Sequence, residues 1–409
     1  MEYNDIFNDI PQSYFDYILR EKRGKMNLEH FVNSGYNEWM SESDLAAIEL
    51  TEDEMTNYTN IYYSKFKSES ERIITLTYNL NGNNKIPFNT DIFETLTIDN
   101  NNVLDTKQFP SSNGEFVIEG KLKEGVTSLP NSIFYQNTCL TSVKIPKIIT
   151  SFGVLTFSNC TNLTNVSFQK GSKLTSLGES SFSNCTNLTS IEIPSEVTSI
   201  GYGTFSKCTN LTNVSFAENS KLTLIEINAF GDCTSLTSIE LPNGVTEIKK
   251  QAFDGCTNLT SIEIPSEVTS IGEQCFIDCT SLTSVTFAEN SKLVTIGKRA
   301  FYKSPIQSIV IPRNLYSIQE EAFKYSELKE VTIEEGSRIG RIYSQSFYGC
   351  TQLNTIRCYA TTAPTIDKYS FQQIVSNGTL YYPKGSDYSS WLSSDSYYLG
   401  YYGWNGVEI

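Results

Sequence analysis

One internal repeat constrains the fold of this chain more than any other feature. The stretch FSNCTNLTSIEIPSEVTSIGYGTF at residues 182–205 recurs almost unchanged as FDGCTNLTSIEIPSEVTSIGEQCF at residues 253–276. One phenylalanine marks each unit at intervals of 22 to 25 residues: Phe134, Phe157, Phe182, Phe205, Phe230, Phe253, Phe276, Phe301, Phe323, Phe347 and Phe371. A period of roughly 20 to 50 residues is typical of solenoids, in which each repeat forms one unit of a stack.

Apolar residues recur at fixed positions within each unit. In residues 182–205 the run LTSIEI has the spacing of a short strand with an inward apolar side, and Pro194 ends that strand because proline cannot donate to a ladder. Gly201 is expected to turn the chain. Because one unit cannot bury its apolar side alone, stacked units share a continuous core. We predict a repeat solenoid of parallel β coils, with roughly ten coils spanning on the order of 50 Å.

The length of the repeat varies at one place only. The 25-residue units contain FQKGSKL or FAENSKL where the 23-residue units contain a short IP turn. Polar turns tolerate insertions better than strands do. We therefore expect the two extra residues to enlarge a corner of the coil and to leave the rest of it unchanged.

Three segments are expected along the chain. Residues 1–110 form a small α/β N-terminal module, helical over 1–72 and with strands over 72–108. Residues 111–375 form the solenoid, and residues 376–409 form an aromatic-rich C-terminal cap. Since a solenoid exposes its terminal coils, the N-terminal module serves either as a cap or as a docking domain for an assembly partner.

The repeat pattern LTSIEIPSEVTSIG, followed by phenylalanine and cysteine, resembles the BspA-like leucine-rich repeats of surface proteins and phages of gut bacteria. The resemblance covers about residues 116–375, and its pattern is kept in most units. It implies a leucine-rich-repeat-like solenoid used for adhesion and protein binding rather than for catalysis. Many bacterial members carry an export signal, whereas the first residues here have no positively charged segment followed by an apolar one.

Charge and hydropathy narrow the classes of partner. The formal net charge of −15 argues against nucleic acid, because binding to phosphates requires a basic face. No apolar run approaches the length of about 18 residues that predicts a transmembrane helix, so membrane insertion is not expected. We expect the protein on a virion or a cell surface, or in the cytoplasm if it is a scaffold.

The cysteines predict no chemistry of their own. Seven of the ten lie three residues after a phase phenylalanine, in one column of the stack: Cys160, Cys185, Cys208, Cys233, Cys256, Cys279 and Cys350. Equivalent positions have no natural pairing, so we interpret them as free, buried thiols. The only histidine, His30, lies in no catalytic pattern, and neither a metal nor another cofactor is predicted.

The outward side of the strands is the first candidate binding surface. Repeated carboxylates such as Glu240 and Glu263 can stack as the acid pair of a glycosidase does, but Ser215 and Thr286 occupy the same column, which favours a solvated face. A flat, hydroxylated face of low charge suits a protein or glycan receptor. The predicted ligand-binding residues are Thr189, Glu192, Thr212, Thr237, Glu240, Thr260, Glu263 and Thr283.

Aromatic residues concentrated near the C-terminus form the second candidate. Tyrosine and tryptophan offer a large contact area at low entropic cost, but they also suit a cap over the last coil. These residues are Tyr381, Tyr388, Trp391, Tyr398, Tyr402 and Trp404. Taken together, the features predict a non-enzymatic binding or adhesion protein on a phage particle or cell surface, attached through its N-terminal module. The alternative is an intracellular scaffold for protein–protein interaction.

Overall fold

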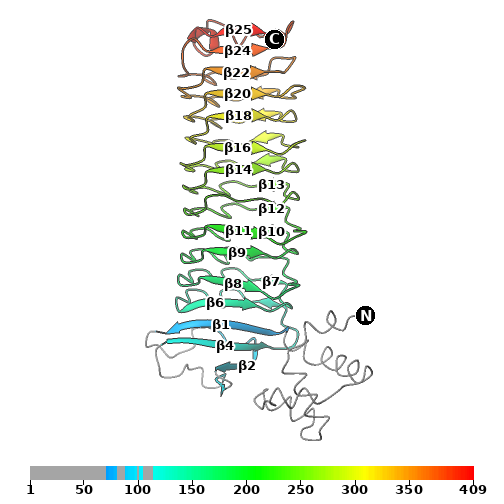
Figure 1. Ribbon diagram of the computed structural model, residues 1–409, viewed down its shortest axis with the longest axis vertical. Helices are drawn as coiled ribbons and strands as arrows, with labels where there is room; N and C mark the ends of the chain where they lie inside the picture. The colour runs from blue at the N-terminus through cyan, green and yellow to red at the C-terminus, as the bar shows by residue number, and fades with distance from the viewer. Residues whose placement is uncertain (1–70, 81–87, 99–100, 105–113) are drawn as a thin grey trace, which may run out of the picture.

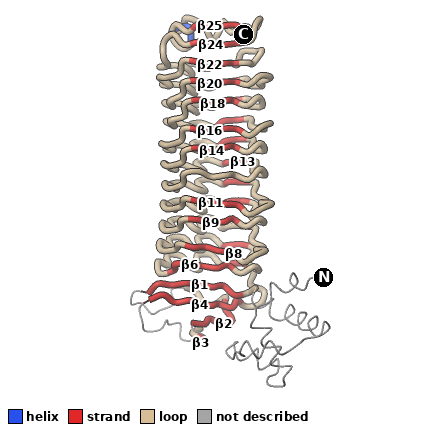
Figure 2. The backbone as a smooth tube through the Cα atoms, in the orientation of Figure 1, coloured by secondary structure: helices blue, strands red, loops and turns tan. Residues whose placement is uncertain are grey.

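The computed structural model describes residues 71–80, 88–98, 101–104 and 114–409 as a straight rod of stacked coils (Figure 1). Figure 2 shows that strands and turns make up nearly all of it. Within the described part of the chain, the one helical element is the 3-10 helix η2 (Leu399–Tyr402). The solenoid expected from the repeat is confirmed, while the helical region expected over residues 1–72 lies almost wholly outside the described residues.

The longer strand of each coil lies on one side of the rod, which we call the strand face. Each strand has an inward apolar side, as in β9, where Ile191 and Ile193 are buried and Glu192 is exposed. β9 ends directly before Pro194, as the sequence predicts. The strands of this face are β6 (Leu140–Ile145), β8 (Asn165–Phe168), β9 (Ser190–Ile193), β11 (Asn213–Phe216), β14 (Ser261–Ile264), β16 (Ser284–Phe287), β18 (Ser308–Ile311), β20 (Glu330–Ile333), β22 (Thr355–Cys358), β24 (Thr379–Tyr382) and β25 (Asn405–Glu408).

A second, two-residue strand in each coil forms what we call the short-strand face. Its parallel pairing runs without interruption through eight strands, from β10 to β23. Two earlier strands pair with each other, and isolated bridges at Ser176 join them to this sheet. The strands are β5 (Ser128–Leu129), β7 (Ser151–Phe152), β10 (Ser199–Ile200), β12 (Leu224–Ile225), β13 (Glu247–Ile248), β15 (Ser270–Ile271), β17 (Thr295–Ile296), β19 (Ser317–Ile318), β21 (Arg341–Ile342) and β23 (Thr365–Ile366).

Four strands close the N-terminal end of the rod: β1 (Ile73–Leu80), β2 (Phe93–Ile98), β3 (Asn101–Asn102) and β4 (Gly114–Leu122). β1 pairs antiparallel both with β4 and with β6, the first long strand of the stack. These strands therefore continue the strand face instead of forming a separate sheet. Gly114–Leu122, where the first coil was expected to begin, belongs to this antiparallel sheet.

The phase phenylalanines form one stack through the core of the rod. Neighbouring rings from Phe134 to Phe371 have centroids 5.1 to 5.5 Å apart and planes within 13° of each other. Phe88 lies against the first ring, at 5.1 Å, and Trp391 against the last, at 5.4 Å. The two ends of the described chain thus cover the two ends of the stack.

The turn around each phase phenylalanine, which we call the Phe arc, has an unusual backbone. In the Phe182 coil, Ser180 and Asn184 have φ of 51° and 59°, in the left-handed region. This conformation allows the N–H groups of Ser180, Phe182 and Asn184 to donate to carbonyl oxygens of the next coil, over 2.8, 2.9 and 2.8 Å. Non-glycine residues rarely adopt this region, so the coil spacing is maintained at some conformational cost.

Gly201 differs from the expectation that it turns the chain. It does not have a positive φ; instead, a Cβ on Gly201 would lie 3.0 Å from the carbonyl oxygen of Leu177 in the preceding coil. The equivalent Gly178 is tighter, because its Cβ would lie 2.0 Å from the carbonyl oxygen of Gly153. Glycine is needed here for the close approach of successive coils.

Candidate binding surface

The predicted threonines and glutamates lie at or beside the strands of the strand face, except Thr237 and Glu240, whose coil has no assigned strand at this point. Thr189, Thr212, Thr260 and Thr283 are exposed, and each precedes a strand. The Thr212, Thr260 and Thr283 hydroxyls donate to the carbonyl oxygen of the threonine one coil earlier, over 3.0, 3.1 and 3.3 Å. These hydroxyls therefore bridge coils, and only their remaining acceptor capacity faces a ligand.

The predicted glutamates are exposed and surrounded by hydroxyl groups. In the paired strands Glu192 lies opposite Ser215, and Glu263 lies opposite Thr286. Glu240 lies in the stretch 238–241, which is not assigned to a strand. Solvated carboxylates with hydroxyl neighbours can accept hydrogen bonds from a ligand, and this environment does not desolvate them as a general acid requires.

The strand face is interrupted, a feature that we did not predict from the repeat. The long strands form four separate sheets, the first three ending on β8, β11 and β16. Each of these three strands ends on a half-buried phenylalanine (Phe168, Phe216 or Phe287), where other strands such as β9 end on a buried isoleucine. All three lie in 25-residue coils. The longer repeat thus alters the strand face and not only a corner, and the phenylalanine at the strand end is the sequence signal for it.

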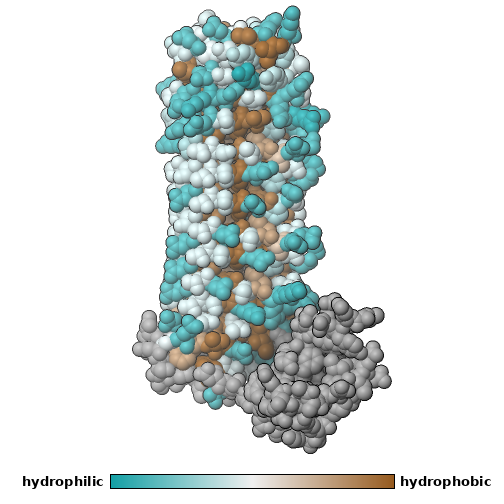
Figure 3. Space-filling view, viewed as in Figure 1, coloured by the Kyte–Doolittle hydropathy of each residue, from teal (hydrophilic) through white to brown (hydrophobic). Residues whose placement is uncertain are grey.

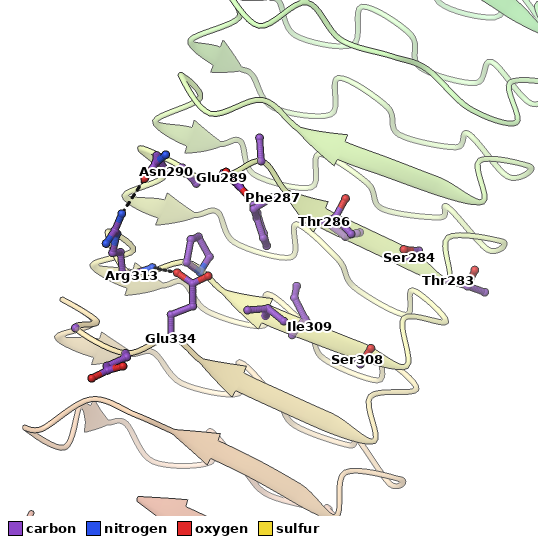
Figure 4. A pocket seen from close by; sticks show the side chains of 17 residues that line it. Thr283, Ser284, Thr286, Phe287, Glu289, Asn290, Ser308, Ile309, Arg313 and Glu334 are labelled. Carbon is purple, nitrogen blue, oxygen red and sulfur yellow. Dashed lines mark hydrogen bonds between the residues drawn. The ribbon is translucent and has the colours of Figure 1, made fainter. Parts of the chain in front are cut away.

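A groove opens at the interruption between β16 and β18, with a volume of about 960 Å³. Figure 4 shows Phe287 and Ile309 in its middle, with Thr283, Ser284 and Ser308 toward one end. Val310, on the same wall, is 50% exposed. This part of the groove offers apolar contact flanked by hydroxyl groups.

The opposite end of the same groove is charged. There the Nη2 group of Arg313 donates to the Asn290 side-chain oxygen over 2.9 Å, and its backbone N–H donates to a carboxylate oxygen of Glu334 over 2.9 Å (Figure 4). Arg313 has thus one fixed hydrogen bond from its guanidinium and further donors toward solvent. A ligand lying along the groove contacts hydroxyl groups at one end. At the other end it contacts the Arg313 cation, which has the side-chain oxygens of Asn290 and Glu334 beside it.

A second groove of about 670 Å³ lies between β11 and residues 238–241. Its walls include Phe216, Glu240 and Pro242, so it repeats the combination of a half-buried ring with polar neighbours. In the space-filling view of Figure 3, apolar residues gather in a band along the rod, on the side where Figure 1 labels the long strands. The two grooves therefore belong to a face that is apolar along its middle and polar at its margins.

The predicted C-terminal aromatics lie mostly inside the rod. Tyr388, Trp391 and Trp404 are buried, and the two indole N–H groups donate to the carbonyl oxygens of Pro364 (2.8 Å) and Val375 (2.9 Å). The other three are half-buried: Tyr381, Tyr398 and Tyr402. Their burial matches the expected cap more closely than it matches an exposed binding site.

The cysteine column is buried, and all ten cysteines are free. Each column thiol donates to the carbonyl oxygen of the phase phenylalanine one coil earlier; Cys208, for example, donates to Phe182 over 3.1 Å. Burial raises the pKa of Cys160, Cys208 and Cys350 to about 12, so these thiols are protonated at neutral pH. A buried thiol with a raised pKa is a poor nucleophile.

Two further observations bear on the chemistry of the described residues. No group of three or more histidine, cysteine, aspartate or glutamate side chains among them is arranged to hold a metal ion. Nor does the described part of the chain contain a helix with the length and apolar character needed to cross a membrane. The fold and its open, grooved face define a solenoid repeat protein.

The chain belongs to the family of the BspA type leucine rich repeat region, whose six-copy model matches residues 127–258, 218–329 and 294–390. These matches cover more than half of the 409 residues. The resemblance noted in the sequence is therefore confirmed. A comparison with curated proteins gives no significant match.

Several solved structures are similar in sequence and local fold. A leucine-rich repeat protein from Bacteroides ovatus is 22% identical, with 66% of this chain and 74% of that chain covered and a TM-score of 0.48. A leucine rich cell surface protein from Faecalibacterium prausnitzii is 25% identical, with 57% and 83% covered and a TM-score of 0.30. The pneumococcal vaccine antigen PcpA is 19% identical, with 60% and 74% covered and a TM-score of 0.37.

Proposed function

We propose that this protein is a non-enzymatic binding or adhesion protein that holds a protein or glycan ligand on its strand face. The observation that carries the proposal is the pair of grooves at the interruptions of that face, each combining a half-buried phenylalanine with hydroxyl and charged groups. Membership of a family of repeat proteins that generally bind rather than catalyse supports it. Apolar walls with a few polar groups are typical of ligand sites.

A binding role suits the electrostatics of this face better than a catalytic one. General acid–base catalysis needs a titrating group whose pKa is shifted by burial or by a close charge. The exposed carboxylates have the hydroxyl groups of Ser215 and Thr286 beside them. The thiols whose pKa values are strongly raised lie inside the coils, away from the strand face. The geometry therefore supports recognition by shape and hydrogen bonding.

The location that suits this function is a surface, of a cell or of a virus particle, with the N-terminal module as the attachment. An antibody against the repeats, applied to fractions of the native source, tests this. Recovery on intact cells or on purified particles is the expected result. Recovery only in the cytosol would instead favour an intracellular scaffold for protein partners.

The strand face itself is tested by substitutions that the repeat already accepts. Thr286 and Val310 occupy the outward strand position where other coils carry Lys144, Glu192 or Arg357. The double variant Thr286→Lys and Val310→Lys should therefore fold, yet place two cations in the groove and reduce adhesion of the full chain to its native surface at least tenfold. Tyr316→Thr, on the short-strand face at the position of Thr198, is the control. Equal adhesion by the groove variant and the wild type would rule out the groove between β16 and β18 as the site of adhesion.

A further inference from the structure

A second exposed feature lies on the Phe arcs, not on the strand face. Three consecutive coils carry a tyrosine one or two residues after the phase phenylalanine: Tyr302, Tyr325 and Tyr348. Their rings contact edge to face, with centroids 5.9 and 5.6 Å apart. Tyr325 is 41% exposed and the other two are half-buried. We call these residues, with the cations around them, the tyrosine ridge.

Cations accompany every ring of the ridge. The Lys303 ammonium lies 5.3 Å from the Tyr302 centroid, and the Lys324 ammonium lies 5.4 Å from Tyr325 and 4.9 Å from Tyr348. In the described part of the chain, all cation–π contacts occur from Arg299 onward, and the earlier coils have none. The rod thus differs in character along its length, although its repeat is uniform.

A buried carboxylate organises the ridge. Glu321 is only 7% exposed, and it accepts hydrogen bonds from Arg299 Nε and, over 2.7 Å, from Lys324 Nζ. Burial alone would raise the pKa of Glu321, but these two cations overcome it and lower the pKa. The carboxylate therefore stays ionised and holds both cations against the rings, so the geometry exists before a ligand arrives.

We propose that the tyrosine ridge binds the carboxylate groups of an acidic polysaccharide. Charge complementarity is the first reason: Arg299 and Lys324 share one ion-pair partner, Glu321, and the neighbouring Glu320 pairs with Lys298, so the cations of the ridge exceed its carboxylates on a chain of net charge −15. Lys303 is exposed, and no described carboxylate forms an ion pair with it. The tyrosine rings add flat apolar edges and hydroxyl groups, which complement a pyranose ring and its substituents.

The spacing of the ridge favours a polysaccharide over an acidic peptide. Successive coils here advance by 5.2 to 5.3 Å, as the stacked phase rings show. Pyranose units linked through equatorial bonds advance by close to this distance per sugar, so one sugar meets one coil. An extended peptide repeats its same-side residues every roughly 6.6 Å, and it loses register with the coils within three steps.

The test uses the full chain and β-(1→4)-linked polymannuronate, a polymer of uronic acid whose linkages are equatorial, in affinity gel electrophoresis. Lys303→Asp inserts the residue that Asp232 and Asp278 provide at the same coil position, and Lys207→Asp makes the same charge change outside the ridge. Tyr348→Ser inserts the residue found at Ser206, and Tyr135→Ser is its matched control. These substitutions copy residues already present in the repeat, so folding is preserved.

Polymannuronate should retard the wild type, and added salt should weaken the effect because part of the attraction is electrostatic. Lys303→Asp and Tyr348→Ser should each lower the affinity at least fivefold, while Lys207→Asp and Tyr135→Ser leave it unchanged. The proposal is overturned if the ridge variants bind like their controls, or if poly-L-glutamate is bound as tightly as polymannuronate. Because the ridge is independent of the grooves, the Thr286→Lys and Val310→Lys variant should keep this binding even if the proposed function fails.

Discussion

At the scale of single residues, the left-handed positions of the Phe arc show how the repeat tolerates variable side chains. Lys207, Asp232 and Tyr325 occupy one coil position with φ of 63°, 57° and 61°. For most side chains this conformation costs roughly 1–2 kcal/mol, because Cβ crowds the following carbonyl oxygen. The hydrogen bond that the backbone N–H donates to the next coil offsets this cost. The N–H of Lys207, for example, donates to the carbonyl oxygen of Gly231 over 2.7 Å. At these positions, a residue that adopts the left-handed conformation at a lower cost should therefore stabilise the protein.

Lys207→Asn should raise the melting temperature. Asparagine adopts the left-handed region more readily than lysine, and Asn159 and Asn184 already occupy this position in other coils. The expected gain in the free energy of unfolding is part of the roughly 1–2 kcal/mol cost of the left-handed conformation, and differential scanning fluorimetry measures it as a higher melting temperature. Lys207→Ala is the control, since alanine keeps the crowded Cβ without a local polar group. An asparagine variant no more stable than the alanine variant would contradict the argument.

Several residue roles could be read from the sequence, and others required the coil geometry. The column of cysteines predicted free, buried thiols, and these are found. Their bond to a carbonyl oxygen one coil away was not predictable, because the repeat period does not indicate which backbone atom faces a side chain. Gly201 was assigned to a turn for the same reason: the sequence marks a glycine, but only the distance to Leu177 distinguishes close approach from a left-handed turn.

At the scale of elements, the strands were predictable and their pairing was not. The apolar spacing of LTSIEI places β9 and β14 correctly, since alternation depends on local sequence alone. Pairing depends on how the strands of two neighbouring coils lie relative to each other. A phenylalanine at the end of β16, in place of isoleucine, coincides with a lost ladder to β18, and that loss creates the larger groove. The regular repeat therefore predicts which residues lie on the strand face. It does not predict the grooves, because these form where a coil departs from the repeat.

The C-terminal segment is an element whose stability depends on one side chain. Trp391 is fully buried, lies against Phe371 and donates to the carbonyl oxygen of Pro364. Trp391→Ala should cost about 3–5 kcal/mol locally, because it removes a large buried ring and leaves a cavity. We expect limited proteolysis to cleave within residues 376–409 while the earlier coils persist, since each coil is stabilised mainly by its neighbours.

The control for this prediction is Trp391→Phe, which keeps an aromatic ring over Phe371 and loses the indole N–H and only part of the buried ring volume. It should leave the segment far more resistant to protease than the alanine variant does. Cleavage spread evenly along the rod in Trp391→Ala would mean that the last coil stabilises the entire stack.

At the scale of the whole molecule, the rod has one continuous apolar core, and the column of buried cysteine thiols runs along it. The buried apolar residues form a single cluster from Ile74 to Trp404, so the coils share their stability. Seven thiols are distributed along that core, and burial raises the pKa of each of them, for Cys160, Cys208 and Cys350 from 9.0 to about 12. The column thereby couples the stability of the rod to alkaline pH.

The sign of that coupling follows from the two states. Below pH 9 the thiols are protonated in both the folded and the unfolded chain, and they contribute no pH dependence. Between pH 9 and 12 the unfolded chain releases thiol protons that the folded chain retains, so the free energy of unfolding falls by about 1.4 kcal/mol per pH unit for each thiol. Thermal melts between pH 8 and pH 10.5, with a reductant present, should show a steep loss above pH 9. Cys208→Ser, which copies Ser304 at the same coil position, removes one titrating group and should make the loss shallower. An identical pH profile for Cys208→Ser and the wild type would show that groups other than the column set the alkaline limit of the rod.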